Sequence, residues 1–106
     1  MDDIIDGLLA MGIKGEAVGE AINLGSGKEH RVIDLANMVN ELTSNEAGVN
    51  YVERRDWDVK HRLLSSIAKA KRLLGYEPQT GFEKGLKKVH AWFVENWADI
   101  NGSAEF

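Results

Sequence analysis

The sequence predicts a small α/β domain, close to an α+β lobe, in which about four helices accompany two or three short strands. Three observations predict this class. Apolar residues recur at helical spacing in four segments, two short apolar segments resemble strands, and glycines separate the segments. With 106 residues, of which 43% are hydrophobic, the chain fits one domain with its own core. The expected order is α-β-α-β-loop-α-α.

Two helices and two strands are expected in the first half of the chain. Apolar residues at helical spacing predict a helix over residues 2–11, with Gly12 as its stop. A second amphipathic pattern predicts a helix over residues 32–43. Apolar and β-branched residues predict short strands over residues 21–24 and 49–52.

Gly25 and Gly27 follow the first expected strand. Such a pair permits positive φ and lets backbone or ligand approach closely. The spacing is not that of a P-loop, so we interpret the pair as a tight turn in preference to a phosphate site.

The second half is predicted to hold a polar loop and two helices. Residues 53–65 are mostly polar and irregular, and such loops often carry functional groups. A helix is expected over residues 66–74, capped by Ser66 and followed by Gly75. A longer helix is expected over residues 82–100.

The longer helix is expected to start at a capping box that runs from Thr80 to Glu83. Its apolar stripe consists of Phe82, Leu86, Val89, Phe93, Trp97 and Ile100. We interpret these residues as core in preference to a ligand platform. Residues 1–100 are expected to form the lobe, and residues 101–106 a disordered tail.

Composition excludes several classes of function. The net charge of −4 and pI of 5.3 argue against binding to nucleic acid. The absence of cysteine excludes disulfides and thiolate metal sites. No leader peptide and no apolar run of about 20 residues is present, so we expect a cytoplasmic protein without membrane contact.

The sequence offers no catalytic constellation. His30, His61 and His90 lie far apart along the chain, without the helical spacing of a metal pair. No serine lies in a strand–turn–helix elbow, and no G-x-G-x-x-G fingerprint follows a strand. We therefore expect no catalytic residue, no metal and no cofactor site within this chain.

The candidate binding residues lie in the polar loop: Arg55, Trp57, Asp58 and Arg62. Arg55 suits a phosphate because its guanidinium presents a planar fork of donors. Asp58 suits a ribose hydroxyl, or it orients Arg55 through a salt bridge that fixes the loop. Trp57 either packs under the loop or stacks on a base.

Five motifs in order resemble the C-terminal end of the extended short-chain dehydrogenase/reductases. They are Ala21-Ile22-Asn23-Leu24-Gly25-Ser26-Gly27, Val32-Ile33-Asp34-Leu35-Ala36, the Arg55-x-x-Asp58 pair, Lys69-Ala70-x-x-x-Leu74-Gly75-Tyr76-x-Pro78 and Phe82-Glu83-x-Gly85-Leu86. The similarity is to the NAD-dependent sugar-nucleotide epimerases and dehydratases, with UDP-glucose 4-epimerase as the nearest type.

The resemblance implies a substrate-binding lobe whose parent enzyme holds NAD in an N-terminal Rossmann domain with a Tyr-x-x-x-Lys pair. It implies that Arg55 contacts the diphosphate and Asp58 the ribose of a UDP- or dTDP-linked sugar. The lobe by itself is expected to be inactive and monomeric, with the Rossmann domain as its partner. Trp57 stands where the family often has glycine, which puts the loop shape in question.

Two other functions fit the residues. One is a standalone protein-interaction module that uses the aromatic last helix or the basic loop. The other is an RNA-binding domain that uses the cations between Arg54 and Arg72, although the acidic total argues against it.

Overall fold

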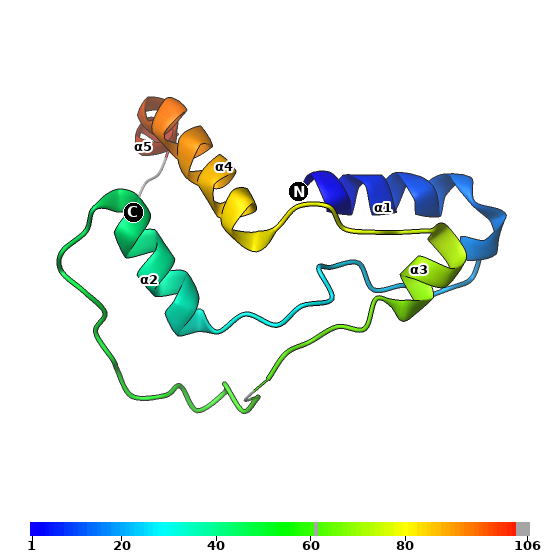
Figure 1. Cartoon of the computed structure of the whole chain (residues 1–106), viewed down its shortest axis with the longest axis horizontal. Helices are drawn as coiled ribbons and strands as arrows, with labels where there is room; N and C mark the ends of the chain where they lie inside the picture. The colour runs from blue at the N-terminus through cyan, green and yellow to red at the C-terminus, as the bar shows by residue number, and fades with distance from the viewer. Residues whose placement is uncertain (61, 104–106) are drawn as a thin grey trace. The chain divides into compact units, whose positions relative to one another are not determined.

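The computed structural model describes residues 1–60 and 62–103, which form two compact units (Figure 1). Unit 1 consists of residues 1–31 and 51–80, and unit 2 of residues 32–50 together with the chain from Gly81 onward. The helices are α1 (Asp2–Ile13), the 3₁₀ turn η1 (Gly15–Ala17), α2 (Val32–Thr43), α3 (Ala68–Leu74), α4 (Phe82–Glu95) and α5 (Trp97–Ser103).

The prediction of an α/β class is wrong, because the described residues form helices and no strand. Residues 21–24 and 49–52 have no ladder of backbone hydrogen bonds to a neighbouring segment, and a strand exists only through such pairing. Figure 1 draws both as plain trace. The apolar pattern of residues 21–24 still has a role, since Ile22 and Leu24 pack against the core of unit 1. The pattern indicated burial correctly but could not supply a pairing partner.

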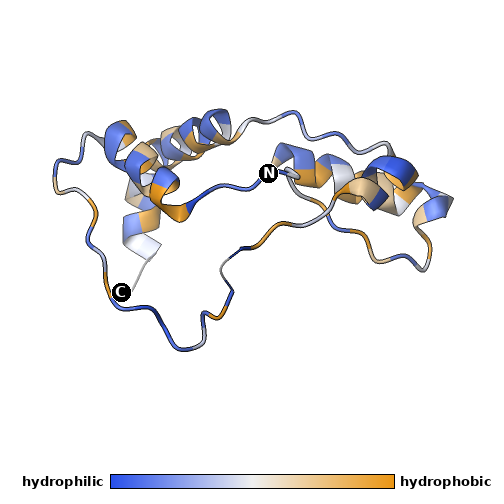
Figure 2. Ribbon diagram, turned by 60° about the horizontal axis from the view of Figure 1, so that its bottom comes forward, coloured by the Kyte–Doolittle hydropathy of each residue, from blue (hydrophilic) through white to orange (hydrophobic). Residues whose placement is uncertain are grey.

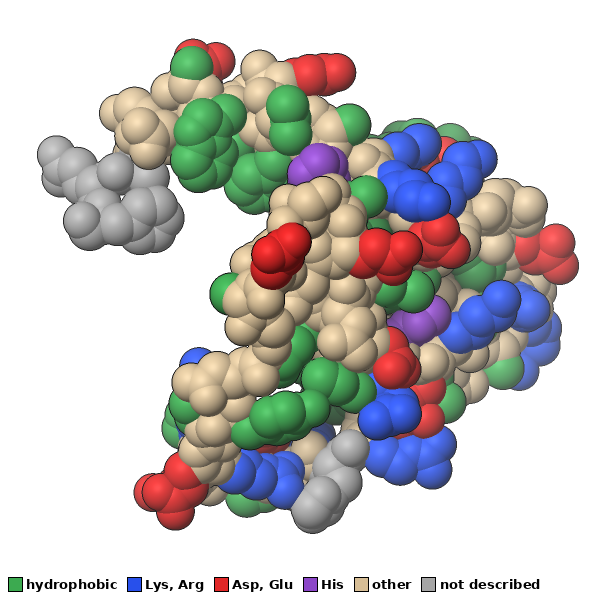
Figure 3. Space-filling view, turned by 60° about the vertical axis from the view of Figure 1, so that its left-hand side comes forward, with side chains coloured by type: hydrophobic (Ala, Val, Ile, Leu, Met, Phe, Trp, Pro, Cys, Tyr) green, Lys and Arg blue, Asp and Glu red, His purple; other side chains and the backbone are tan. Residues whose placement is uncertain are grey.

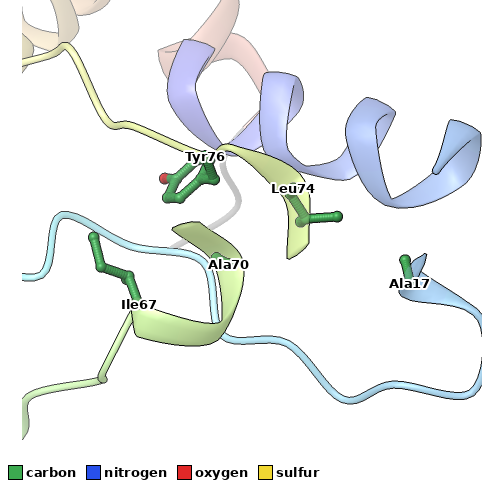
Figure 4. Packing of buried hydrophobic residues seen from close by; sticks show 5 residues of the cluster. All are labelled: Ala17, Ile67, Ala70, Leu74 and Tyr76. Carbon is green, nitrogen blue, oxygen red and sulfur yellow. The ribbon is translucent and has the colours of Figure 1, made fainter. Parts of the chain in front are cut away.

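Unit 1 has a small closed core. Its buried residues are Ala17, Ile67, Ala70, Leu74 and Tyr76 (Figure 4). They come from η1, from α3 and from the residues on either side of α3. Ala70 is fully buried. The short helix α3 is therefore the centre of this unit.

Close backbone approaches explain two glycines of unit 1. A Cβ on Gly7 would lie 2.8 Å from both terminal carbons of Leu24, so any other residue there would displace the Leu24 side chain. Gly27 has φ of +65°, and a Cβ on it would lie 2.9 Å from Cδ1 of Ile67. Gly27 thus has the positive φ that the glycine pair was expected to permit, whereas Gly25 does not.

Polar contacts attach the neighbouring segments to α1 and α3. The Asp3 carboxylate accepts backbone hydrogen bonds from Gln79 at 2.9 Å and Thr80 at 3.0 Å. The bond from Gln79, and to a smaller extent the bond from Thr80, lowers the pKa of Asp3 below its ordinary value of 3.8. The Lys14 ammonium donates to the carbonyl oxygen of Leu74 at 2.8 Å, which satisfies an end carbonyl of α3.

Unit 2 contains amphipathic helices, and none of its described residues is buried. Orange and blue residues alternate around these helices (Figure 2), as the sequence predicts. Contacts join α2 to α4 and α4 to α5. The predicted core stripe of α4 stays partly open, with Phe93 44% and Trp97 59% exposed. Hydrophobic side chains are accordingly visible on the surface in Figure 3.

The helix boundaries confirm some predictions and correct others. Gly75 ends α3 in the left-handed conformation, as predicted. The helix predicted over residues 82–100 is two helices, since the chain leaves helical geometry at Asn96. The predicted capping box does not form, because Gly81 caps α4 without a side-chain bond. Helix α5 reaches Ser103, and the rest of the predicted tail lies outside the described residues.

Candidate functional site

Arg55 and Asp58 stand at the two ends of one tight turn in unit 1. The backbone N–H of Asp58 donates to the carbonyl oxygen of Arg55 at 3.0 Å. The N–H of Val59 donates to the carbonyl oxygen of Trp57 at 3.1 Å. A turn closed in this way brings its first and fourth Cα atoms within about 7 Å of each other. One exposed turn therefore presents both the guanidinium and the carboxylate.

The Trp57 ring lies against Arg55. The guanidinium carbon of Arg55 is 5.2 Å from the ring centroid, within the range of a cation–π contact. The Trp57 residue is 73% exposed, so it does not pack under the loop. Its ring restricts the directions in which the fork of Arg55 can point.

Arg54 is a member of the loop that the sequence did not single out. Its Nη2 lies 3.6 Å from Oδ1 of Asp58 and donates to the carbonyl oxygen of Lys60 at 3.1 Å. Asp58 thus forms an ion pair with Arg54, whereas Arg55 contacts the ring of Trp57. Two adjacent arginines are equivalent by residue type, so only their placement distinguishes these roles.

Arg62 is held by a carboxylate from a distant part of the sequence. Its Nε donates to Oε1 of Glu29 at 2.8 Å, and its Nη2 donates to Oε2 at 2.6 Å. This bidentate hydrogen bonding lowers the pKa of Glu29 below its ordinary 4.5 and raises the pKa of Arg62. Glu29 was not among the sequence-predicted residues, and nothing in the spacing of 33 residues indicated the pair.

A hollow of about 320 Å³ lies elsewhere in unit 1, beside α1 and the end of α3. Its lining includes Asp3, Asp6, Glu77 and Tyr76, and none of the four predicted site residues. Burial, reinforced by the charge of Asp3, raises the pKa of the Tyr76 hydroxyl. Three carboxylates around this hollow would repel a diphosphate. The exposed turn, which carries the guanidinium donors of Arg54 and Arg55 beside the carboxylates of Asp56 and Asp58, is the better candidate for an anion.

The glycine turn does not fit the binding of a dinucleotide. A third glycine would be needed at the sixth position of the fingerprint, where the chain has His30. The space beside Gly27 is taken by the side chain of Ile67. Glycine at position 27 therefore allows close packing against Ile67. No chemical step is assigned to NAD in this chain.

The described residues contain neither a cluster of metal ligands nor a membrane-spanning helix. Among residues 1–60 and 62–103, no group of three or more acidic, histidine or cysteine side chains is placed to hold a metal ion. His61, one of the three histidines, lies outside the described residues. Within the same part of the chain, no helix has the length and hydropathy required to cross a bilayer.

Comparison with known proteins gives matches over nearly the whole chain. The structure of the epimerase Mth375 from Methanothermobacter thermautotrophicus is 64% identical over 99% of this chain, with a TM-score of 0.95. The Bordetella bronchiseptica enzyme WbmF, solved in complex with NAD⁺ and UDP, is 34% identical over 95% of this chain, with a TM-score of 0.79. No protein-family model matches the chain.

A similar match exists to a plant enzyme. The trifunctional UDP-glucose 4,6-dehydratase/UDP-4-keto-6-deoxy-D-glucose 3,5-epimerase/UDP-4-keto-L-rhamnose-reductase RHM3 of Arabidopsis thaliana is 33% identical over 96% of this chain. The chain spans 16% of that protein, 31% of the Mth375 chain and 30% of the WbmF chain. The similarity therefore concerns one part of each larger enzyme.

Proposed function

Since this chain belongs to the extended short-chain dehydrogenase/reductases, where it matches the C-terminal lobe, we propose that it binds the nucleotide diphosphate of an activated sugar. Arg55 binds the diphosphate and Asp58 binds the ribose. The observation that carries this proposal is the backbone hydrogen bond that closes a turn from Arg55 to Asp58.

The chemistry of the turn suits this ligand. A guanidinium fork matches the paired oxygens of a phosphate, and the contact is strengthened by charge. A carboxylate accepts hydrogen bonds from the vicinal hydroxyls of a ribose. Trp57 orients the guanidinium of Arg55 through the ring contact, and Arg54 forms an ion pair with the carboxylate of Asp58. Arg62 lies in the same loop, where its charge is paired with that of Glu29.

The reaction proposed for the whole enzyme is epimerisation or dehydration of a UDP- or dTDP-linked sugar. The hydride chemistry that NAD supplies belongs to parts of the enzyme outside this chain, because the glycine turn here does not fit a dinucleotide. Within that enzyme this lobe anchors the nucleotide while the sugar reaches the catalytic groups. Matches to epimerases and dehydratases over at least 95% of the chain favour this function over a standalone interaction module.

Titration of the full-length protein with UDP tests the proposal. We expect the amide resonances of residues 54–60 to shift on addition of UDP, observed by ¹H–¹⁵N NMR. Calorimetry should show that Arg55→Ala weakens the binding of UDP by about 10- to 100-fold, since a hydrogen bond to a charged group is worth about 1.5–3 kcal/mol. Asp58→Asn should weaken UDP and leave inorganic pyrophosphate unaffected.

Arg72→Ala is the matched control. Arg72 is an exposed arginine of α3 in the same unit, so its loss changes the net charge equally without altering the turn. If Arg72→Ala weakens UDP as much as Arg55→Ala does, the attraction is general and the assigned roles are wrong. Unshifted resonances of the loop at millimolar UDP would also reject the proposal.

A further inference from the structure

A bidentate ion pair joins the loop that carries the proposed site to the rest of unit 1. The contacts described above within the loop are local: Arg54 reaches Lys60, and the turn closes between Arg55 and Asp58. Glu29 reaches the loop from the segment that follows the glycine turn, 33 residues earlier in the sequence. A contact across that separation constrains the loop, whereas contacts inside it shape the turn.

The geometry of the pair makes it a directional constraint. Two parallel hydrogen bonds at 2.8 and 2.6 Å join the fork of Arg62 to both oxygens of Glu29. A bidentate pair fixes the relative orientation of its partners as well as their distance. The Glu29 side chain is 33% exposed, which is less than half the exposure of Arg62 at 77%. Glu29 is therefore the better-anchored partner, and Arg62 is the group that it holds.

The base of the Glu29 segment is itself fixed by packing. Gly27 lies so close to Ile67 that a Cβ would contact the Ile67 side chain at 2.9 Å. Ile67 belongs to the buried core of unit 1. The path from the core through Gly27 and Glu29 to Arg62 thus connects the loop to the buried core of this unit.

We propose, as an inference that rests on the proposed function, that Glu29 is a positioning residue. Through its bidentate ion pair with Arg62, Glu29 holds the loop so that Arg55 and Asp58 face the same ligand. Glu29 itself does not contact the nucleotide. Loss of the pair releases the loop, and the ligand must then order it again on binding. The pair also leaves N–H donors of Arg62 outside the two bonds to Glu29, so a phosphate can be bound on the other edge of the guanidinium.

The opposite role predicts the opposite sign. If Glu29 competed with the diphosphate for Arg62, its removal would tighten the binding of UDP. A positioning role predicts weaker binding after the same change. The affinity of Glu29→Gln for UDP therefore separates the two mechanisms without knowledge of the sugar.

The first experiment measures UDP affinity of the full-length protein by calorimetry. We expect Glu29→Gln to weaken the binding of UDP by about 3- to 10-fold, because the nucleotide must then order the released loop when it binds. Glu20→Gln is the matched control, because Glu20 forms an ion pair with Lys69 of α3 in the same unit and not with the loop.

The second experiment needs no ligand. Heteronuclear ¹⁵N–{¹H} NOE values of residues 54–60 report motion of the loop on the picosecond to nanosecond timescale. We expect them to fall in Glu29→Gln and to stay at the wild-type level in Glu20→Gln. Unchanged values, or equal effects of the two variants, would overturn the positioning role even if UDP did not bind.

The two measurements keep this inference separate from the proposed function. If Arg55→Ala abolishes UDP binding while Glu29→Gln binds as well as wild type or better, the nucleotide site stands and the positioning role fails. If Glu29→Gln loosens the loop but neither wild type nor variant binds UDP, the proposed function fails, and the assignment of Glu29 to a nucleotide site fails with it.

Discussion

Unit 1 and unit 2 each contain amphipathic helices, yet they bury apolar side chains to different depths. In unit 1, α1, η1, α3 and the segment through Leu24 converge, and five hydrophobic residues are buried. In the described part of unit 2, helix pairs are in contact and every residue keeps at least intermediate exposure. Two helices in contact cover only one side of each other, so a closed core needs elements from further directions.

The comparison also separates two kinds of glycine. Gly27 in unit 1 and Gly48 in unit 2 have similar positive φ values, +65° and +75°. Only Gly27 of these two meets a side chain where a Cβ would be, since nothing lies within 4 Å at Gly48. Both glycines therefore adopt a positive φ, but Gly27 is also closely packed, whereas Gly48 borders open space.

The largest loss of stability is expected when a buried side chain in the core of unit 1 is truncated. Leu74→Ala should destabilise this unit by about 2–5 kcal/mol, because Leu74 is 4% exposed and its removal leaves a cavity. Leu86→Ala in α4 is the matched change in unit 2, where the leucine is only half-buried. We expect it to cost about 1 kcal/mol. Site-resolved amide hydrogen exchange measures each unit separately, and equal losses would show that the difference in burial has no energetic meaning.

The next effect separates backbone strain from packing. Gly48→Ala should cost about 1–2 kcal/mol for an L-residue held at positive φ. Gly27→Ala should cost about 1–3 kcal/mol more, since its methyl group must also displace the Ile67 side chain. Urea denaturation monitored by circular dichroism gives both values. Equal costs at the two positions would mean that Ile67 moves aside freely.

A smaller effect is expected at the hydroxyl of Tyr76. This hydroxyl donates to the carbonyl oxygen of Gly25 at 3.2 Å, which attaches the glycine turn to the core of unit 1. Tyr76→Phe keeps the ring and should cost about 0.5–1.5 kcal/mol. Exchange of amides near Gly25 should accelerate, while amides of α4 should not change. An unchanged exchange rate at the turn would show that ring packing alone holds it.

The smallest effect is expected for the stability of unit 1 at low pH. The folded pKa of Asp3 is lowered below 3.8 by the backbone N–H of Gln79 first and that of Thr80 in addition. A group whose folded pKa is depressed stabilises the fold above its unfolded pKa and loses that contribution as pH falls through the folded pKa. Asp3→Asn should therefore lose part of the acid dependence of unit 1 below about pH 4, as followed by pH titration of unfolding.

Asp6→Asn, on the same helix, is the control for Asp3. The backbone amides of residues 79 and 80 bind the Asp3 carboxylate, so the Asp6 variant should keep the acid dependence. A similar flattening in both variants would assign the effect to the charge of α1 as a whole.

Local rules predicted most of the helices. Apolar spacing placed α1 and α2 within two residues of their ends, and Gly75 marked the end of α3. These features depend on neighbours within one or two turns, and the sequence carries that information directly. The break at Asn96 and the missing capping box were not predictable in this way, because both local patterns also permit the other outcome.

The binding roles of the candidate site residues stay a prediction. Residue types identified Arg55 and Asp58 as binding candidates in a polar loop, and the turn between them agrees with their separation of three residues. The partners of the loop were missed. Arg54 and Glu29 were not selected, because an ion pair is formed by approach in space and sequence distance does not restrict it.

The sequence by itself determined most of the helices, the glycine stop after α3 and the chemistry available to the loop, since each depends on residues adjacent along the chain. Tertiary structure alone decided that residues 21–24 form no strand, that α3 becomes the buried centre of unit 1, and that Glu29 holds Arg62. The reason is physical: strand pairing, burial and ion pairing each require a partner that the chain brings from elsewhere.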